Sequence, residues 1–544
     1  MLQIRMSANR LQLLECEIPE CPVVPPPVNH SFLQNTEHLG ALLQSVAVSH
    51  FSEPAITTAA HQWTYGELLA AVREVADRLS SEPGFSPGDR VVLLLPNSPE
   101  YLIAFYGVLS AGGVVVPLPP AIEKDALRGV LATTDPVWIM TTAGVLKARS
   151  GLISESSEVL RTGTRASTVS PPEIDCGDSG PQPAAIFFTA GSTGTPKGVV
   201  LSHRNLISNA RSIQQYLQID RSECALCVLP FHHAFGNSVV QSHLLAGAQL
   251  VLAGQAMFPE TLIRAIADHR CTSLSGVPDL FRVLLERTSL GQNPLPSLRY
   301  MAVAGGALPL ELAVSAGRRI APAKFFVMYG QTEATARLAF LPPEDLDSVQ
   351  PGCIGRPVPG VTLQVVDDLG EPVAAGVIGE LRARGDNVML GYWRDPAATT
   401  ERIRSGWLYT HDLALTDETG RFVLQGRRSS LVKIAGFRVQ PSDLEEFAVR
   451  RLSAAQAVAV ACETRDRGTR LALFIRPLSG EAGLSAAEAV ARCRAELPRH
   501  FVPDLIQQVS EFPLNHALKT DRLVLTRVAE EQISRRYQAE TCSS

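Results

Sequence analysis

Short runs of apolar residues alternate with longer segments of helical periodicity along most of the chain. The apolar runs predict buried strands, and the periodic segments predict helices that cover them. Thr64 and Glu67 form a capping box, which predicts a helix over residues 68–79. Strands are predicted over residues 90–95, 114–116, 199–201, 250–252 and 300–303. This alternation is typical of an α/β fold whose sheets carry helices on both faces.

One uncharged stretch, between Glu100 and Glu123, superficially resembles a membrane span. Its start predicts a helix instead, because Ser98 can cap the first turn and Pro99 fits within it. Gly112 and the glycine after it end that helix. A helix of about thirteen residues is ~20 Å long, too short to cross a bilayer. We therefore expect a buried helix followed by a strand, and no membrane span.

The pattern changes after Gly426, where a short polar and charged segment suits a hinge. Beyond it, helices are predicted over 439–450 and 485–497, with strands over 457–461 and 471–475. About 110 residues of mixed α and β structure suffice for a separate small domain. The predicted organisation is a Pro-rich lead-in over 1–36, a large domain of packed α/β subdomains over 37–426, a small mobile α+β domain over 427–535, and a tail over 536–544.

Composition narrows the range of functions. The chain of 544 residues carries 49 basic and 54 acidic side chains, a formal net charge of −5. Near neutrality argues against a general polyanion-binding surface, and so against nucleic acid as a partner. A hydrophobic share of 45% excludes wholesale disorder. The 10 cysteines are scattered, and residues 1–10 lack the apolar core of a secretory signal, so we expect reduced thiols in a cytoplasmic protein.

A dense cluster of glycine and hydroxyl residues follows an apolar strand and ends at a lysine: the sequence IFFTAGSTGTPKG over 186–198. Glycines let backbone N–H groups approach an anion, hydroxyls donate further hydrogen bonds, and Lys197 adds positive charge. The pattern predicts a polyphosphate cradle rather than an ordinary flexible loop. It is not a Walker A loop, because Pro196 precedes the lysine and a strand, not a helix, follows.

This loop resembles the signature of the adenylate-forming superfamily, which includes acyl- and aryl-CoA synthetases, adenylation domains and firefly luciferase. Further segments match the family's motifs in order: YGQTEA over 329–334, GWLYTHD over 406–412, GR at 426–427 leading to KIAGFRV over 433–439, and PLNHALKTDR over 513–522. The resemblance covers about residues 40 to 530. Several motifs in one order are far more specific than any one alone.

The resemblance implies that ATP converts a carboxylic acid to an acyl-adenylate with release of pyrophosphate. A carboxylate attacking the α-phosphate brings anions together, so the site needs cations and oriented donors. Phosphate contacts are implied for Thr189, Ser192, Thr193, Gly194, Thr195 and Lys197. Nucleotide contacts are implied for Gly305, Gly306, Tyr329, Thr332, Asp412 and Arg427.

The resemblance also gives individual roles. Tyr329 would pack on adenine, Thr332 would contact the α-phosphate, and Asp412 would accept from the ribose hydroxyls. Glu333 would hold Mg²⁺, a cation that prefers oxygen ligands, and Lys519 would reach the reacting carboxylate and the α-phosphate. Taken singly, each could be an ordinary surface or core residue, so these roles depend on the motifs.

Three positions depart from the family's pattern. His411 stands where glycine often precedes the ribose-binding aspartate, and it either crowds the ribose or points away. Leu518 replaces the glycine before the motif lysine, and leucine disfavours the positive φ that glycine allows. Ser429 takes the hinge position, where a small polar residue can still absorb a backbone rotation.

The family's second half-reaction transfers the acyl group to a thiol after the small domain rotates. Lys433 and Gly436 lie on the loop expected to face the site then, and the glycine would let a pantetheine arm pass. Retention of this loop favours a thioester on CoA or on the phosphopantetheine of a carrier protein.

Residues 231–237 contain no acidic side chain to pair with a substrate ammonium group. This favours a fatty or aryl acid over an amino acid. The candidate acyl pocket is formed by His232, Phe235, Val277, Gly305, Gly306 and Gly330. A stand-alone amino-acid adenylating protein and a non-catalytic scaffold remain as alternatives, and nothing selects luciferase-like oxidation.

A zinc site is the competing interpretation of Cys224 and Cys227 followed by His232 and His233. We instead interpret residues 224–230 as a buried strand, whose alternation places the two thiols on opposite faces.

Overall fold

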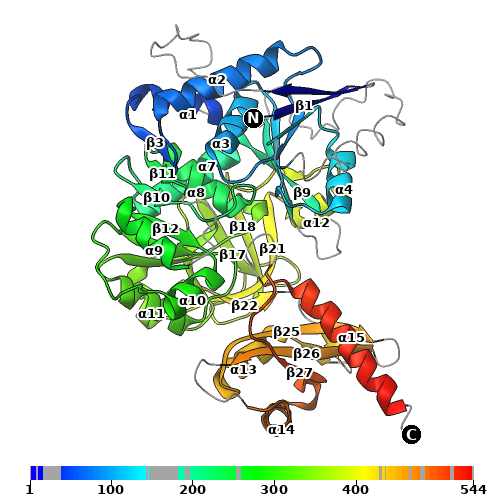
Figure 1. Cartoon of the computed structure of the whole chain (residues 1–544). Coiled ribbons are helices and arrows are strands. Elements are labelled where there is room, and N and C mark those ends of the chain that lie inside the picture. Colours follow the sequence, from blue (N-terminus) through cyan, green and yellow to red (C-terminus); the bar gives the residue numbers. More distant parts are fainter. Residues whose placement is uncertain are drawn as a thin grey trace. The chain divides into compact units, whose positions relative to one another are not determined.

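The computed structural model describes residues 2–7, 10–15, 38–142, 145, 182–189, 196–252, 259–427, 432–434, 437–464, 468–477, 484–514 and 520–541. It confirms an α/β fold with a large N-terminal part (Figure 1). The chain divides into two compact units, each described by itself below. The first comprises Met1–Gln364, Arg382–Thr410 and Thr416–Val423, and the second Val365–Leu381, His411–Leu415 and Leu424–Ser544.

The first sheet of the larger unit is buried between helices. Among the described residues its order is β19 (Gly391–Tyr392), β9 (Lys197–Ser202), β8 (Pro183–Thr189), β6 (Val114–Pro117), β5 (Arg90–Leu94), β7 (Trp138–Thr141), β1 (Leu2–Ser7) and β2 (Arg10–Glu15). Alternate residues Val92 and Leu94 of β5 pack with Leu127 of α4 (Lys124–Thr134). α3 (Pro99–Ser110) packs against β5 and β6, and α1 (Leu39–Ser49) and α2 (Tyr65–Ser81) pack beside it (Figure 1).

Local capping determines where the first helices begin, as predicted. The capping box of Thr64 and Glu67 is present at the start of α2. The Ser98 side chain accepts from the backbone N–H of Tyr101, and Pro99 lies in the first turn of α3. α3 has 12 residues and is almost wholly buried before β6 follows, which confirms the buried helix. In the part of the chain that the structure describes, no helix is long and apolar enough to span a membrane.

The N-terminal strands were not predicted. β1 and β2 pair antiparallel with each other, and β1 pairs antiparallel with β7 at the edge of the sheet. The sequence analysis treats residues 1–36 as an extended lead-in because proline is frequent there. Edge strands of this kind are specified by their partner in the sheet, which a local pattern does not reveal.

The second sheet supplies the framework for the candidate site. Within the larger unit its order is β16 (Cys353–Pro357), β15 (Ala339–Leu341), β14 (Lys324–Tyr329), β13 (Tyr300–Val303), β12 (Ser273–Gly276), β10 (Cys224–Leu226), β11 (Gln249–Val251), β3 (Pro54–Thr57) and β4 (Gln62–Thr64). β14, β13, β12, β10, β11 and β3 run parallel. The associated helices are α7 (His203–Leu217), α8 (Ala234–Leu244), α9 (Pro259–Asp268), α10 (Pro278–Arg287) and α11 (Leu310–Ile320).

The remaining elements between residues 332 and 427 are short. They are η1 (Thr332–Ala334), η2 (Pro343–Ser348), β17 (Val361–Val366), β18 (Gly379–Gly385), α12 (Pro396–Arg402), β20 (Ile403–Arg404), β21 (Trp407–Thr416) and β22 (Phe422–Arg427). The strand predicted over 224–230 ends at Leu226, so Cys227 lies beyond it. Pro230 has no backbone N–H to continue a strand, and the chain turns before α8.

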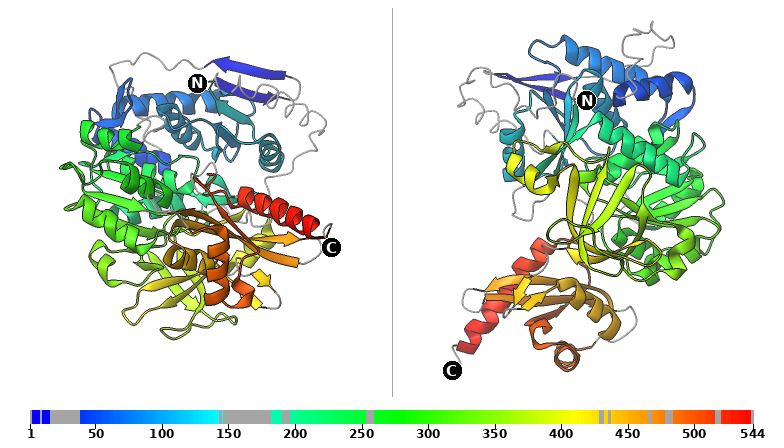
Figure 2. Two further views of the ribbon diagram at one scale, coloured as in Figure 1. Left: turned by 60° about the horizontal axis from the view of Figure 1, so that its bottom comes forward. Right: turned by 180° about the vertical axis from the view of Figure 1, so that it is seen from behind.

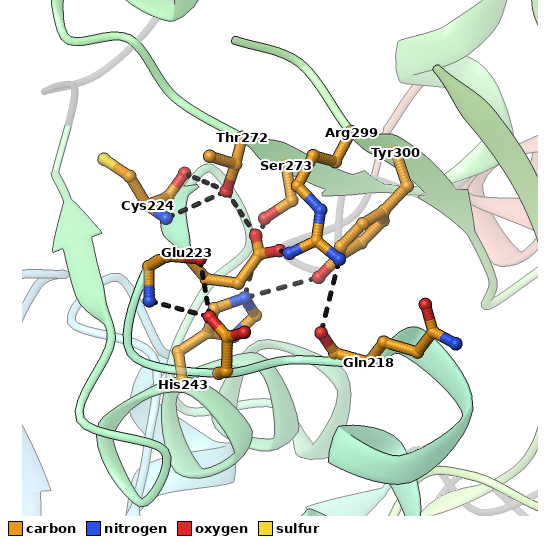
Figure 3. Close-up of polar contacts among 10 residues, drawn as sticks. Gln218, Glu223, Cys224, His243, Thr272, Ser273, Arg299 and Tyr300 are labelled. Atoms are coloured by element: carbon orange, nitrogen blue, oxygen red, sulfur yellow. Dashed lines mark hydrogen bonds and ion pairs between the residues drawn. The ribbon is translucent and has the colours of Figure 1, made fainter. Parts of the chain in front are cut away.

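A buried polar cluster joins the amino ends of β10, β12 and β13 (Figure 3). The Glu223 carboxylate is fully buried and accepts from the Thr272 hydroxyl and the Arg299 guanidinium. Burial is the main cause that raises the pKa of Glu223, and its two donors oppose that shift. Close by, the His243 ring lies 3.3 Å from the Tyr300 hydroxyl, and burial lowers the pKa of His243 to about 4. The cluster fixes the strand register at the edge opposite the candidate site.

The smaller unit contains a three-stranded sheet of β25 (Ala454–Thr464), β26 (Gly468–Pro477) and β27 (Leu505–Gln508). Ala457 and Ala459 of β25 pack toward α13 (Pro441–Arg451) and α14 (Ala486–Glu496). Val458 and Val460 pack toward α15 (Arg522–Thr541) on the other face (Figure 2). This two-residue alternation produces the predicted α+β architecture. β23 (Val432–Ile434) and β24 (Phe437–Val439) pair separately from this sheet, and η4 (Arg499–Phe501) precedes β27. α15 continues past residue 535, after which a tail is predicted.

Candidate active site

The carboxyl ends of four parallel strands carry the predicted acyl-pocket residues and several of the predicted nucleotide contacts. Residues 231–237 follow β10, Val277 follows β12, Gly305 follows β13, and Tyr329 ends β14. Because these strands are parallel neighbours, their carboxyl ends lie along one edge of the sheet. Gly305 has a φ of 88°, which glycine adopts without the strain that a side chain would bring. The fold therefore brings the predicted nucleotide and acyl segments together.

The segment after β14 turns back tightly on itself. A Cβ atom on Gly330 would lie 1.8 Å from the backbone oxygen of Ala336, so only glycine fits there. Thr335 and Ala336 have φ values of 58° and 121°, in the left-handed region that side chains disfavour. The Thr335 hydroxyl donates to the backbone oxygen of Asn387 at 2.6 Å, and the Asn387 amide donates to that of Ala334 at 3.2 Å. These bonds hold the turn that carries Thr332 and Glu333.

Glu333 lies at the centre of a cationic and aromatic cluster. The Tyr392 hydroxyl donates to Oε1 of Glu333 at 2.8 Å, and the Arg402 guanidinium lies 3.7 Å from the same oxygen. The Lys197 ammonium lies 5.2 Å from the centre of the Tyr392 ring. Burial is the main cause that raises the pKa of Tyr392, and the Glu333 charge adds to it. The structure thus joins the phosphate-loop lysine to the predicted metal ligand.

Sequence reasoning did not find Tyr392 and Arg402. Tyr392 belongs to the two-residue strand β19 and Arg402 ends α12, far along the chain from Glu333. Arg402 also donates to the Gln331 side chain at 2.9 Å, which anchors the turn from a second point. An arginine and a tyrosine outside any motif give no local signal of this role.

The phosphate loop is described at its two ends. β8 leads into it and β9 leads out, antiparallel, with Thr189 opposite Lys197 in the pairing. The Thr189 hydroxyl donates to the Lys197 backbone oxygen at 3.5 Å. A strand, not a helix, follows at Lys197, which confirms that this is not a Walker A arrangement. Ser192, Thr193, Gly194 and Thr195 lie outside the described residues.

The donors around Glu333 are compatible with Mg²⁺ bound together with a nucleotide. Magnesium usually takes one or two protein carboxylates and completes its shell with phosphate oxygens and water. The contacts of Glu333 with Tyr392 and Arg402 both use Oε1. Within the described ranges, no three or more His, Cys, Asp or Glu side chains gather as a metal cage. A single carboxylate near the lysine that is predicted to bind phosphate therefore fits the metal's needs without further protein ligands.

The predicted acyl pocket contains an unexpected arginine. Arg337 is 2% exposed, and its guanidinium lies 4.1 Å from the centre of the Phe235 ring at the start of α8. Burial lowers the pKa of Arg337, whereas a hydrogen bond with the Tyr216 hydroxyl opposes that change. Arg337 is the one charged residue in the apolar run ATARLAFL over 334–341, and that contrast could have identified it from the sequence.

The other predicted pocket residues lie nearby in the fold. Val277 is buried and immediately precedes α10, while the rings of His232 and His233 lie 4.5 Å apart just before α8. A Cβ on Gly306 would lie 3.3 Å from the Pro278 side chain, so the backbone passes close to α10 there.

Cys224 and Cys227 are both buried, and their sulfur atoms contact different backbone oxygens, those of His269 and Ala225. Burial is the main cause that raises the pKa of Cys227, which disfavours the thiolate that zinc would need.

The two residues predicted to bind the ribose, Asp412 and Arg427, both lie in the smaller unit. Asp412 is 5% exposed, and its Oδ1 accepts from Nε of Arg427 at 2.9 Å. The structure therefore pairs the two residues that the sequence analysis assigns to the ribose. His411 has a φ of 60°, so it occupies the left-handed conformation that glycine adopts more readily than other residues.

The terminal motif is anchored through Arg522. Its guanidinium lies 2.7 Å from the Glu445 carboxylate on α13 and donates to the Ala459 backbone oxygen at 2.8 Å. Leu514 pairs with Thr520 in an isolated antiparallel bridge, which closes the ends of the intervening segment. Lys519 itself, Ser429 and Gly436 lie outside the described residues. Lys433 lies on β23 opposite Arg438, in the hairpin expected to face the thiol.

The family model of the AMP-binding enzymes matches residues 43–393, more than half of the chain. The chain belongs to the AMP-binding enzyme family. As the motif order and the site predict, it is an ATP-using, AMP-forming ligase, and the resemblance to adenylate-forming enzymes is confirmed.

Named relatives of this AMP-binding enzyme include ligases for different acids. A long-chain-fatty-acid–CoA ligase of Escherichia coli O157:H7 is 28% identical over 528 residues, covering 88% of this chain and 91% of the relative. An L-proline–[L-prolyl-carrier protein] ligase of Streptomyces coelicolor is 30% identical over 511 residues, covering 88% of this chain and 94% of the relative. The crystal structure of ATP-bound MatB from Rhodopseudomonas palustris shares the fold, with a TM-score of 0.77, 24% identity and coverage of 91% and 99% of the two chains.

Proposed function

We propose that this AMP-binding enzyme activates a fatty or aryl carboxylic acid and then transfers it to a thiol of CoA or of carrier-protein phosphopantetheine. The contact chain from Lys197 through Tyr392 to Glu333 and Arg402 is the observation on which the first step rests. It gathers positive charge and oriented donors where phosphates must be held, which an adenylation step requires. Two observations support a thiol as the acceptor: the β23–β24 pair that carries Lys433, and relatives that are named as ligases for CoA and for a carrier protein.

In the first step a carboxylate oxygen attacks the α-phosphorus, and the bond to pyrophosphate breaks. Lys197 and Arg402 offset the charge of the phosphates, and Thr332 orients the α-phosphate. Mg²⁺ held through Glu333 supplies further charge neutralisation when it is bound. In the second step a thiol sulfur attacks the acyl carbonyl, and AMP leaves with the former bridging oxygen.

Amino-acid activation is the competing candidate, favoured by the 30% identity to the prolyl-carrier ligase. Two features oppose it. Residues 231–237 contain no acid for a substrate ammonium group, and the buried charge of Arg337 beside Phe235 would repel one. A fatty or aryl acid without an ammonium group needs no acidic partner in the pocket and is not repelled by Arg337.

Acid-dependent exchange of labelled pyrophosphate into ATP, with separate fatty, aryl and amino acid panels, tests the proposal. We expect exchange with a fatty or aryl acid, and mass spectrometry should then detect its thioester with CoA or a carrier protein. Exchange with amino acids alone would refute the proposed substrate class. Glu333→Gln should lose exchange, whereas the matched surface variant Glu344→Gln should keep it.

A further inference from the structure

Arg337 is a buried charge without a carboxylate partner. Among the described residues it forms no ion pair, and its Nε, which faces no solvent, has no hydrogen-bond partner. Its Nη1 reaches the backbone oxygen of Ala336 at the long distance of 3.5 Å. The Phe235 ring at 4.1 Å and the Tyr216 hydroxyl are its other polar or π contacts. None of these neighbours carries a negative charge at neutral pH, because burial raises the pKa of Tyr216.

Such an arrangement is costly unless something else compensates. Buried charged groups in proteins are normally paired, because removing an ion from water costs several kcal/mol. A ring face and one hydroxyl offset only part of that cost. Two other buried charges in the described structure follow this rule, because Arg402 faces Glu333 and Glu223 pairs with Arg299. Arg337 departs from it inside the segment that also carries Thr332 and Glu333.

Other buried polar atoms without partners in the described structure lie on α7 and α8, the two helices that contact Arg337 through Asn209 and Phe235. They are Oδ1 of Asn209, Oγ of Ser212 and Nδ2 of Asn237. Asn209 donates through its Nδ2 to the Arg337 backbone oxygen at 3.4 Å, and Ser212 lies one turn further along α7. Asn237 lies on α8, which packs against α7 and carries Phe235 in its first turn. Polar side chains that lack partners on both helices indicate a place for a polar ligand group.

We propose that Arg337 binds a second carboxylate of the acid substrate, so that this enzyme activates a dicarboxylic acid. One carboxylate reacts with ATP beside Thr332 and Glu333, while the distal one pairs with the Arg337 guanidinium and takes donors from Asn237 and Ser212. The planar guanidinium suits this role because it can donate two parallel hydrogen bonds to a carboxylate. This inference rests on the proposed function and narrows its substrate class.

The test compares substrates that differ only at the distal end. Pyrophosphate exchange is measured for α,ω-dicarboxylic acids of increasing length and for benzene dicarboxylic acids. Each is paired with its monomethyl ester and with the monocarboxylic acid of equal length. For the preferred length, we expect kcat/KM of the diacid to exceed that of both partners on the order of 100-fold, because the partners leave a buried charge unpaired.

Two variants separate binding from structural support. Arg337→Met should lower kcat/KM for the diacid on the order of 100-fold and leave the ester nearly unchanged, and Arg337→Lys should recover part of the loss. Arg90→Met is the control. Arg90 is also buried, but it lies on β5 of the first sheet and donates to the backbone oxygens of Thr134 and Asp135. This control variant should lower thermal stability without changing the preference for diacid over ester.

The outcomes are distinct. If the wild-type enzyme has the same kcat/KM for monocarboxylic acids or esters as for diacids, this inference is overturned and the proposed function stands. This comparison needs only the wild-type enzyme, so it holds even if Arg337→Met fails to fold. Equal losses for diacid and ester in Arg337→Met would also overturn it, because Arg337 would then only support the fold. Exchange with none of the carboxylic acids would refute the proposed function itself.

Discussion

The contact between Tyr392 and Glu333 makes a quantitative prediction about metal dependence. Tyr392→Phe removes one hydroxyl and keeps the ring that lies under the Lys197 ammonium. The lost hydrogen bond runs from the Tyr392 hydroxyl to a Glu333 carboxylate oxygen at 2.8 Å. Both groups are largely shielded from water, because Tyr392 is 7% exposed and the Glu333 side chain is 12% exposed. Glu333 would then be held by Arg402 alone among these neighbours, at 3.7 Å.

The magnitude follows from the kind of bond. A hydrogen bond to a charged group contributes about 1.5–3 kcal/mol, and this one is well shielded from water. Every 1.4 kcal/mol corresponds to a tenfold change in an equilibrium constant, so the loss corresponds to roughly 10- to 150-fold. Because the bond orients the predicted Mg²⁺ ligand, we expect the Mg²⁺ concentration for half-maximal exchange to rise by that factor.

Pyrophosphate exchange at saturating acid, measured over a Mg²⁺ series, gives this value directly. Tyr65→Phe is the matched control, because its hydroxyl is also buried and donates to the backbone oxygen of Ala248 at 2.7 Å, with that of Leu244 3.1 Å away. It should lower stability and leave the Mg²⁺ dependence unchanged. An unchanged half-maximal concentration in Tyr392→Phe would refute the role of this bond in positioning Glu333.

Three further predictions concern the smaller unit and the buried histidine. Lys519→Ala should abolish pyrophosphate exchange with the fold retained by circular dichroism, and near wild-type exchange would contradict the terminal-motif assignment. Lys433→Ala should keep exchange but slow thioester formation, whereas the exposed Lys324→Ala should alter neither; equal loss of both steps would count against separate states. His243 has a folded-state pKa of about 4, below its unfolded value, so its contribution is complete above pH ~6.5 and is lost as the pH falls toward 4. The free energy of unfolding can be measured in urea at several pH values. Between pH ~6.5 and 4 it should fall by about 3 kcal/mol more in the wild-type protein than in His243→Gln.

Much of the framework follows from local signals. The strand predicted over 300–303 is β13 itself, and the helix predicted over 485–497 is α14, which Ser485 caps. These elements depend on apolar alternation and on capping side chains a few residues away, so sequence reveals them. β1 and the short strand β19 depend on partners in the sheet, and their sequences give no comparable signal.

The sequence by itself determined the family, the order of its motifs and the residue types predicted to handle ATP, because a motif keeps its chemistry within a few consecutive residues. Tertiary structure decided which other residues meet them. Tyr392 and Arg402 reach Glu333 from β19 and α12, and Arg337 meets Phe235 of α8 from the turn after β14. Such contacts depend on how distant segments pack, and packing also decides whether a charge such as Arg337 is buried and in need of a partner.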